Sequence, residues 1–138
     1  KTEQFTSKVI DLASLLYSVL GLQNSASDLS LEKTAYHAPC HLCRGMGVKI
    51  GPRELLQQAG INYQENREEE NCCGLGGTYS TKFPEISSEI MNYKLDYLER
   101  ENFQRLVTDC PGCILQLRGG AKKRNSSIQV MHLVEALR

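Results

Sequence analysis

The sequence has no net charge, no long apolar run and too few cysteines for a domain built on disulfides. Sixteen Lys and Arg balance sixteen Asp and Glu, so the formal net charge is +0, and no overall positive field attracts nucleic acid or anionic lipid. No apolar run approaches the roughly 20 residues of a membrane-spanning helix. The first residues also lack the apolar core of a secretory signal. We therefore expect a cytoplasmic protein that binds no nucleic acid and has no membrane span of its own.

Length and composition predict one folded domain. Hydrophobic residues make up 41% of the 138 positions and charged residues 23%, which are ordinary values for a globular chain. The length corresponds to a single domain. We interpret residues 1–30 as an N-terminal helix and loop, and residues 31–138 as the body of the domain. Because the chain begins at a lysine, we expect it to be a fragment of a longer subunit.

Short extended segments alternate with helical ones along the chain. Strands are expected at 34–37, 61–64, 105–108 and 128–131, and helices at 5–20, 53–59, 85–100, 111–123 and 133–137. Strands that alternate with helices indicate βαβ units. The expected fold class is therefore α/β, with a small four-stranded parallel sheet flanked by helices. Neither a dinucleotide-binding glycine motif nor a phosphate-binding loop is present, so nucleotide binding has no support.

The six cysteines require a chemical explanation. They fall below the roughly 8–10% of a disulfide scaffold, and clustered thiols in a reducing compartment more often bind metal or do redox chemistry. Five of them follow expected strands: Cys40 the first, Cys72 and Cys73 the second, Cys110 and Cys113 the third. Because the carboxyl ends of parallel strands lie at one edge of a sheet, the sequence predicts one metal site at the C-terminal ends of the strands.

The local sequence around two of these groups suits metal ligands. Cys110 and Cys113 open an expected helix, whose positive end lowers the pKa of nearby thiols. The Cys72-Cys73 pair is followed by three glycines that allow positive φ and close approach of the backbone to a bulky ligand: Gly74, Gly76 and Gly77. A structural zinc site uses four ligands and a cubane cluster needs four cysteines. A set of five therefore implies a non-standard cluster or one spectator thiol.

Three motifs together carry a family resemblance. They are His37-Ala38-Pro39-Cys40-His41-Leu42, Cys72-Cys73-Gly74-Leu75-Gly76-Gly77-Thr78 and Asp109-Cys110-Pro111-Gly112-Cys113, separated by 31 residues from Cys40 to Cys72 and 36 from Cys73 to Cys110. This pattern resembles the cysteine-rich CCG domain of the heterodisulfide reductase B subunit and of the iron–sulfur subunits of glycolate oxidase and lactate utilization. The resemblance covers about residues 32–138 and fits a carboxyl-terminal module. Residues 82–87 are most similar to the lactate-utilization and glycolate-oxidase branch.

The resemblance implies an iron–sulfur electron-transfer module of an oxidoreductase complex. Its unusual 4Fe-4S cluster would be bound by Cys40, Cys72, Cys73, Cys110 and Cys113. Implied partners are an upstream tandem module or other subunits, which could hold the complex at a membrane surface, and a redox partner protein. In the heterodisulfide reductases such a cluster can itself cleave a disulfide, so direct catalysis stays open. Protein produced in air is expected to hold zinc or no metal, because thiolates accept zinc readily.

Two other function classes stay open. A zinc-stabilised structural domain would use Cys40 with Cys43 and Cys110 with Cys113, although the 66 residues between these pairs exceed the roughly 15–20 of compact zinc motifs. A thiol–disulfide redox domain would use Cys110 and Cys113 at the helix start, which leaves the Cys72-Cys73 pair without a role. A Cys110→Ser change would separate the classes by its effect on chromophore, folding or exchange activity.

The remaining candidates have simpler interpretations. Cys43, at a position that is usually apolar in the family, is expected on the apolar face of a short helix rather than as a ligand. His37 and His41 are expected to hydrogen-bond a cysteine sulfur or backbone. Structural or solvated roles are expected for His132, Arg44 and Lys82.

Overall fold

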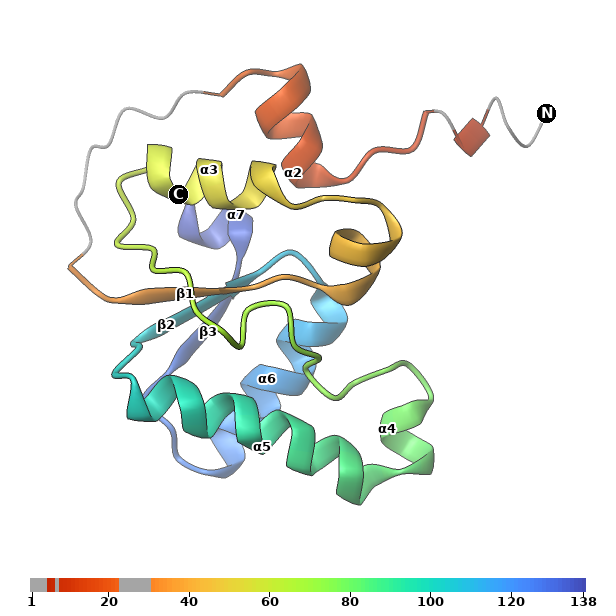
Figure 1. Ribbon diagram of the computed structural model, residues 1–138, viewed down its shortest axis with the longest axis vertical. Coiled ribbons are helices and arrows are strands. Elements are labelled where there is room, and N and C mark those ends of the chain that lie inside the picture. Colours follow the sequence, from red (N-terminus) through yellow and green to blue (C-terminus); the bar gives the residue numbers. More distant parts are fainter. Residues whose placement is uncertain (1–4, 7, 23–30) are drawn as a thin grey trace.

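The computed structural model describes residues 5–6, 8–22 and 31–138, and its centre is a parallel sheet (Figure 1). Within the described residues the sheet has three strands in the order β1-β2-β3, with β1 at Thr34–His37, β2 at Arg105–Thr108 and β3 at Gln129–His132. The helices are α2 (Leu12–Ser14), which continues as the π-helical turn η1 (Leu15–Val19), η2 (His41–Gly45), α3 (Ile50–Gln58), α4 (Tyr79–Lys82), α5 (Pro84–Arg100), α6 (Pro111–Lys123) and α7 (Leu133–Ala136). The expected α/β class with a small parallel sheet flanked by helices is confirmed.

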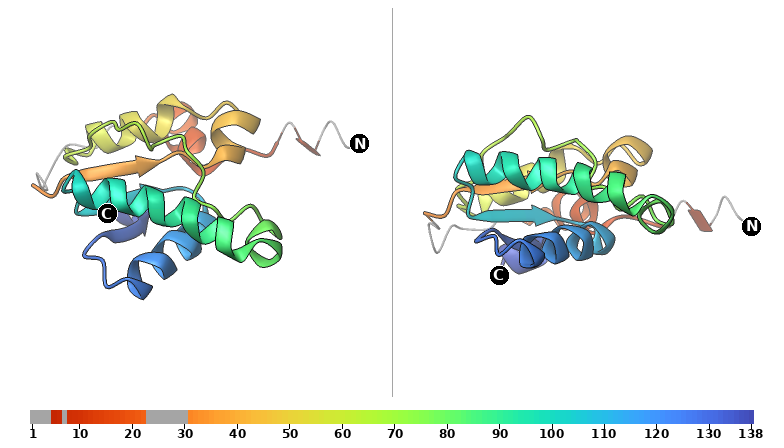
Figure 2. Two further views of the ribbon diagram at one scale, coloured as in Figure 1. Left: turned by 60° about the horizontal axis from the view of Figure 1, so that its bottom comes forward. Right: turned by 90° about the horizontal axis from the view of Figure 1, so that it is seen from below.

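Helices cover both faces of the sheet, with α5 and α6 on one face and α2, α3 and α7 on the other (Figures 1 and 2). Successive strand residues alternate between the two faces. Ala35, Leu106 and Val130 belong to the core under α5 and α6. Tyr36 and Val107 belong to the core under the other helices. The strands are therefore short and mostly apolar because they are covered on both sides.

Residues 61–64, expected as the fourth strand, form no strand in the described part of the chain, which corrects that prediction. Tyr63 makes one isolated parallel bridge to Thr34 at the outer edge of β1, and the next contact is the hydrogen bond from the Ala38 amide to the Glu69 carbonyl, at 2.9 Å. Six residues lead from Tyr63 to Glu69, while four lead from Thr34 to Ala38. The extra length must loop out between the two contacts, so a continuous ladder cannot form.

The N-terminal helix is shorter than the expected range of 5–20. A continuous helical segment begins only at Leu12, because the Asp11 side chain accepts a hydrogen bond from the Ser14 amide at 2.9 Å and caps the helix there. Gly21, with φ of +56°, follows its end as expected. The loop expected at 23–30 lies outside the described residues.

Other boundaries differ by a few residues. The bounds of α6 match the expected helix residue for residue, whereas α3 begins three residues early and β3 is shifted by one. No helix in the described ranges has both the length and the apolar character that a membrane span requires.

Candidate metal centre

Two of the cysteine groups follow neighbouring strands at the same edge of the sheet. β1 ends at His37 and β2 at Thr108, and the two strands are parallel. Cys40 comes three residues after β1, is exposed, and begins η2. Cys110 comes two residues after β2 and occupies the N-terminal cap position of α6, with Pro111 in the first turn of the helix. The fold therefore gives this edge the thiols that were expected from strands 34–37 and 105–108.

Three buried ligand groups from separate segments meet at this edge. The sulfur atoms of Cys73 and Cys113 are 3.2 Å apart. The ring of His37 joins them, so that one ligand atom from each of the three residues lies within 4.8 Å of the others. Imidazole nitrogen and thiolate sulfur are the ligands that zinc and iron accept most readily in proteins. The arrangement has the composition and closeness of a metal site.

Several buried polar atoms at the site find no hydrogen-bond partner among the described residues. They include both ring nitrogens of His37 and the Thr108 hydroxyl. His37 is only 1% exposed and is the register partner of Thr108 across β1 and β2. Buried polar groups are nearly always paired, because an unpaired one costs its full desolvation penalty. These atoms therefore fit a site that accommodates a bound group at the ends of the strands.

The thiols of Cys73 and Cys113 act as a coupled pair. The hydrogen bond with Cys113 lowers the pKa of Cys73, and the nearby His37 acts in the same direction against the effect of burial. The same hydrogen bond, with burial, raises the pKa of Cys113. The contact thus favours ionisation of Cys73 over that of Cys113, and the thiolate is the ionic form that binds metal.

The loop that carries the Cys72-Cys73 pair, the CCG loop, is held by α5 and α6. The Ser87 hydroxyl of α5 donates to the Gly74 carbonyl at 2.8 Å, and the Gln116 amide of α6 donates to the same hydroxyl at 3.0 Å. The Gly74 amide donates to the Cys72 sulfur at 3.3 Å. Gly74 has φ of +90°, and a Cβ atom there would collide with the Ser87 carbonyl oxygen. Glycine is therefore required for this loop to lie against α5.

The other two glycines of the loop also have positive φ, as the sequence suggested, with +53° at Gly76 and +59° at Gly77. Gly76 packs closely against Tyr79, whereas no atom lies within 4 Å of the Cβ position of Gly77. Their contact with a cofactor stays a prediction.

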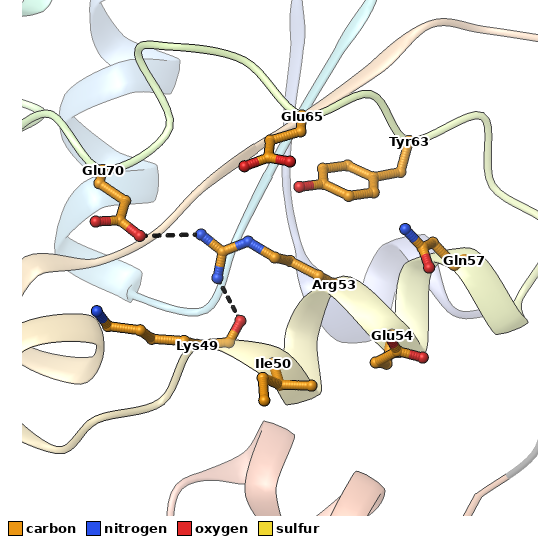
Figure 3. Close-up of a pocket in the computed structure, with 8 residues that line it drawn as sticks. All are labelled: Lys49, Ile50, Arg53, Glu54, Gln57, Tyr63, Glu65 and Glu70. Atoms are coloured by element: carbon orange, nitrogen blue, oxygen red, sulfur yellow. Dashed lines mark hydrogen bonds and ion pairs between the residues drawn. The ribbon is translucent and has the colours of Figure 1, made fainter.

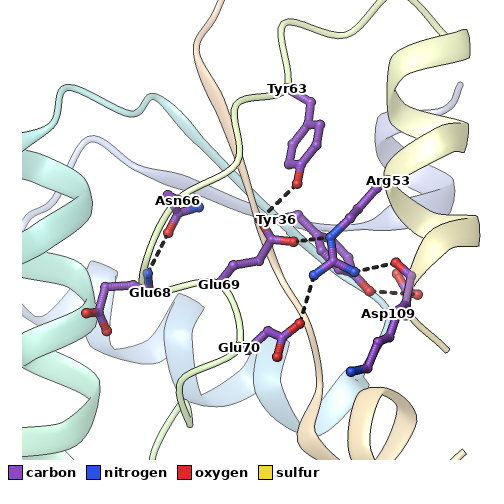
Figure 4. A network of polar contacts seen from close by, with 9 residues as sticks. Tyr36, Arg53, Tyr63, Asn66, Glu68, Glu69, Glu70 and Asp109 are labelled. Carbon is purple, nitrogen blue, oxygen red and sulfur yellow. Dashed lines mark hydrogen bonds and ion pairs between the residues drawn. The ribbon is translucent and has the colours of Figure 1, made fainter. Parts of the chain in front are cut away.

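A polar network anchors the chain just before the Cys72-Cys73 pair (Figure 4). Arg53 of α3 pairs with the Glu69 carboxylate at 2.6 Å, and the Tyr63 hydroxyl donates to the same carboxylate at 2.9 Å. The Tyr36 hydroxyl donates to Asp109 at 3.2 Å, directly before Cys110. Burial raises the pKa of Asp109 to about 7. The network connects α3, β1 and the two cysteine-bearing loops.

The polar pocket beside this network is a weaker candidate for function. It lies between α3 and the loop at Tyr63–Glu70, with Arg53 near its centre (Figure 3). The Arg53 guanidinium is already paired with Glu70 at 3.3 Å and donates to the Lys49 carbonyl. The central cation of the pocket is therefore engaged by the chain itself and is not free to pair with a ligand.

The remaining candidates lie away from the buried thiols or at the surface. Cys43 is 2% exposed and packs in the core under α3, with Ala38 and Leu55, which matches its apolar interpretation. Arg44 is exposed and donates to the Glu70 carbonyl at 3.1 Å. Exposed positions are also found for His41 and Lys82, and His132 caps α7 by accepting from the Val134 amide at 3.2 Å.

Lys94 is a site residue that the sequence interpretation missed. It is 2% exposed and lies on the face of α5 that also carries Met91, Leu95 and Leu98. Burial lowers its pKa to about 8, opposed by Glu68 and by the Cys73 and Cys72 thiols. A lysine in the apolar repeat of a helix was the signal that could have identified it.

Together, the parallel sheet and its edge of converging thiols define a cysteine-rich metal-binding domain. The cysteine-rich CCG domain family matches residues 34–118, which include all six cysteines of the chain. The chain belongs to this family.

Similar proteins narrow the comparison further. The chain is 33% identical over 138 residues to Lactate utilization protein A 2 of Bacillus cereus, covering 99% of this chain and 57% of that protein. It is 34% identical over 132 residues to Lactate utilization protein A of Oceanobacillus iheyensis, with 95% and 54% covered. Against Lactate utilization protein A of Bacillus subtilis the identity is 31% over 139 residues, with 99% and 58% covered. The chain thus spans a little over half the length of these curated relatives.

Proposed function

We propose that this chain is an iron–sulfur electron-transfer module of an oxidoreductase that serves the oxidation of lactate or a related hydroxy acid. The observation that supports it most directly is the convergence of Cys73, Cys113 and the unpaired His37 at the sheet edge of a CCG-family domain. Similarity to proteins named for lactate utilization supports the choice of hydroxy acid.

The ligands in this proposal are Cys40, Cys72, Cys73, Cys110 and Cys113, holding a 4Fe-4S cluster. When bound, the cluster supplies one-electron transfer. The chain's own residues prepare the site: the contact with Cys113 lowers the pKa of Cys73, and Ser87 and Gln116 fix the loop that carries the Cys72-Cys73 pair. Cys40 and Cys72 are exposed and would bring the centre close to the surface, where a redox partner, another subunit or an upstream module exchanges electrons with it.

A zinc-binding structural domain is the second candidate. It is favoured by the set His37, Cys73 and Cys113, since one nitrogen and two sulfur ligands suit a tetrahedral zinc ion. The alternative set that includes Cys43 is less favoured, because that thiol is packed among apolar side chains under α3.

The test is the content of iron, zinc and acid-labile sulfide in protein reconstituted without oxygen, together with its absorption spectrum. The Cys73→Ser variant removes a thiol of the site, and Cys43→Ser is the matched control, because it removes an equally buried thiol from the other core. We expect about four iron and four sulfide per chain, lost in Cys73→Ser and retained in Cys43→Ser. One zinc with no sulfide would overturn the proposal in favour of the zinc domain.

A further inference from the structure

Lys94 is a buried ammonium with no carboxylate partner in the described part of the chain. Its side chain is 2% exposed, and within the described residues its ammonium donates to the backbone carbonyl of Glu68. None of the ion pairs among the described residues includes Lys94. A buried charge is stable only when another charge or a set of hydrogen bonds compensates it. The chain alone supplies little of that compensation.

The nearest acid is already engaged elsewhere. The Glu68 carboxylate accepts a hydrogen bond from the Asn71 side chain at 3.0 Å and lies 4.0 Å from the Arg67 guanidinium. Its charge acts on Lys94 through space, but its hydrogen bond with Asn71 holds the start of the CCG loop. Glu68 therefore leaves part of the Lys94 charge unbalanced.

Besides Glu68, the negative groups that act on Lys94 are the two thiols and Glu69. The Glu69 carboxylate is already paired with Arg53 at 2.6 Å. The charges of Cys73 and Cys72 favour the protonated form of Lys94, and Lys94 in turn disfavours protonation of His37. Geometry agrees with these effects, because the Lys94 ammonium donates to the Glu68 carbonyl, four residues before Cys72. Its buried neighbours on α5, Met91 and Leu95, pack in the same core as the thiols of Cys73 and Cys113. A thiolate-bound metal centre carries net negative charge, which would compensate the positive charge of Lys94.

We propose that Lys94 is the buried counter-charge of the metal centre, where its ammonium offsets the negative charge of Cys72, Cys73 and the group they hold. For an iron–sulfur cluster this inference rests on the function proposed above. One-electron reduction by a donor such as dithionite adds one negative charge to the centre. A fixed positive charge nearby stabilises the reduced form, so Lys94 raises both metal affinity and reduction potential.

The first test compares reduction potentials of the reconstituted chain. Lys94→Gln removes the charge but keeps a hydrogen-bond donor for the Glu68 carbonyl, Lys94→Arg keeps the charge, and Lys122→Gln removes an exposed charge from α6. We expect the reduction equilibrium of Lys94→Gln to shift about tenfold towards the oxidised form, which for one electron is about 59 mV. The potentials of the other two variants should stay close to the original. An unchanged potential in iron-loaded Lys94→Gln would overturn the inference and leave the iron–sulfur proposal standing.

A second test needs no cluster. Metal-free protein is titrated with Co²⁺, and binding is followed by thiolate–cobalt absorption alongside the thermal unfolding midpoint Tm. We expect Lys94→Gln to bind Co²⁺ about tenfold more weakly, with Lys94→Arg near the original, and to have a metal-free Tm that is unchanged or higher. A lower metal-free Tm with unchanged Co²⁺ affinity would make Lys94 a structural residue only. If the original chain takes no iron, the proposed function fails, while the Co²⁺ series still decides the role of Lys94.

Discussion

The helices on the two faces of the sheet bury different kinds of side chain. Under α5 and α6 the buried set includes the polar Ser87, the charged Lys94 and the paired thiols of Cys73 and Cys113. Among the described residues, the buried side chains of α2, α3 and α7 are all apolar. The thiol of Cys43 lies on that second face and is as buried as the thiol of Cys73. Burial alone therefore does not identify a ligand, whereas polar neighbours and a second thiol at contact distance do.

The largest expected effect comes from truncating one core leucine on each face. Leu95→Ala on α5 and Leu56→Ala on α3 each remove a fully buried side chain, so each should lower the free energy of unfolding by about 2–5 kcal/mol. Only Leu95→Ala should also weaken metal binding, because α5 positions Ser87 and Lys94. Denaturant unfolding and metal titration of both variants measure this. Equal loss of metal affinity in the two would contradict the assignment of the site to one face.

A second pair of variants separates the two ends of the CCG loop. Gly74→Ala would place a Cβ atom against the Ser87 carbonyl at a positive φ, so a loss of about 2 kcal/mol of stability is expected. Gly77→Ala has a similar φ but open space around it, and about 1 kcal/mol is expected from the backbone alone. Metal content should fall in Gly74→Ala and be retained in Gly77→Ala. The loop would not be held as described if both variants behaved alike.

The smallest effect is a pH dependence in the polar network beside α3. Burial raises the pKa of Glu69 above its ordinary value of 4.5. The folded state therefore binds this proton more tightly than the unfolded state, and the stabilisation present below pH 4.5 is lost as the pH rises through the folded pKa. In Glu69→Gln this contribution is absent, so the difference in unfolding free energy between the two proteins should change across that range. A constant difference from pH 4 upwards would show that the pKa of Glu69 is not raised.

Much of the framework was predictable because it depends on local patterns. Periodicity located α5 and α6, and the Cys-Pro-Gly-Cys start of α6 was visible as a helix opening after a strand. The order of strands and helices was enough to predict a parallel sheet, and hence an edge at which Cys40 and Cys110 follow neighbouring strands. The prediction of a fourth strand was wrong. Continuous pairing requires equal numbers of residues between two contacts on each of the paired segments, and a short extended pattern carries no information about those numbers.

The sequence by itself determined the family, the α/β class and the set of cysteines, because each of these follows from residue types at fixed spacings along the chain. Only the tertiary structure decided which thiols meet. It placed Cys73 against Cys113 and His37 and packed Cys43 in the opposite core. It also buried Lys94 against the Glu68 carbonyl. These outcomes depend on which side of the sheet each segment packs against, and packing joins residues whose separation in sequence carries no information about their contact.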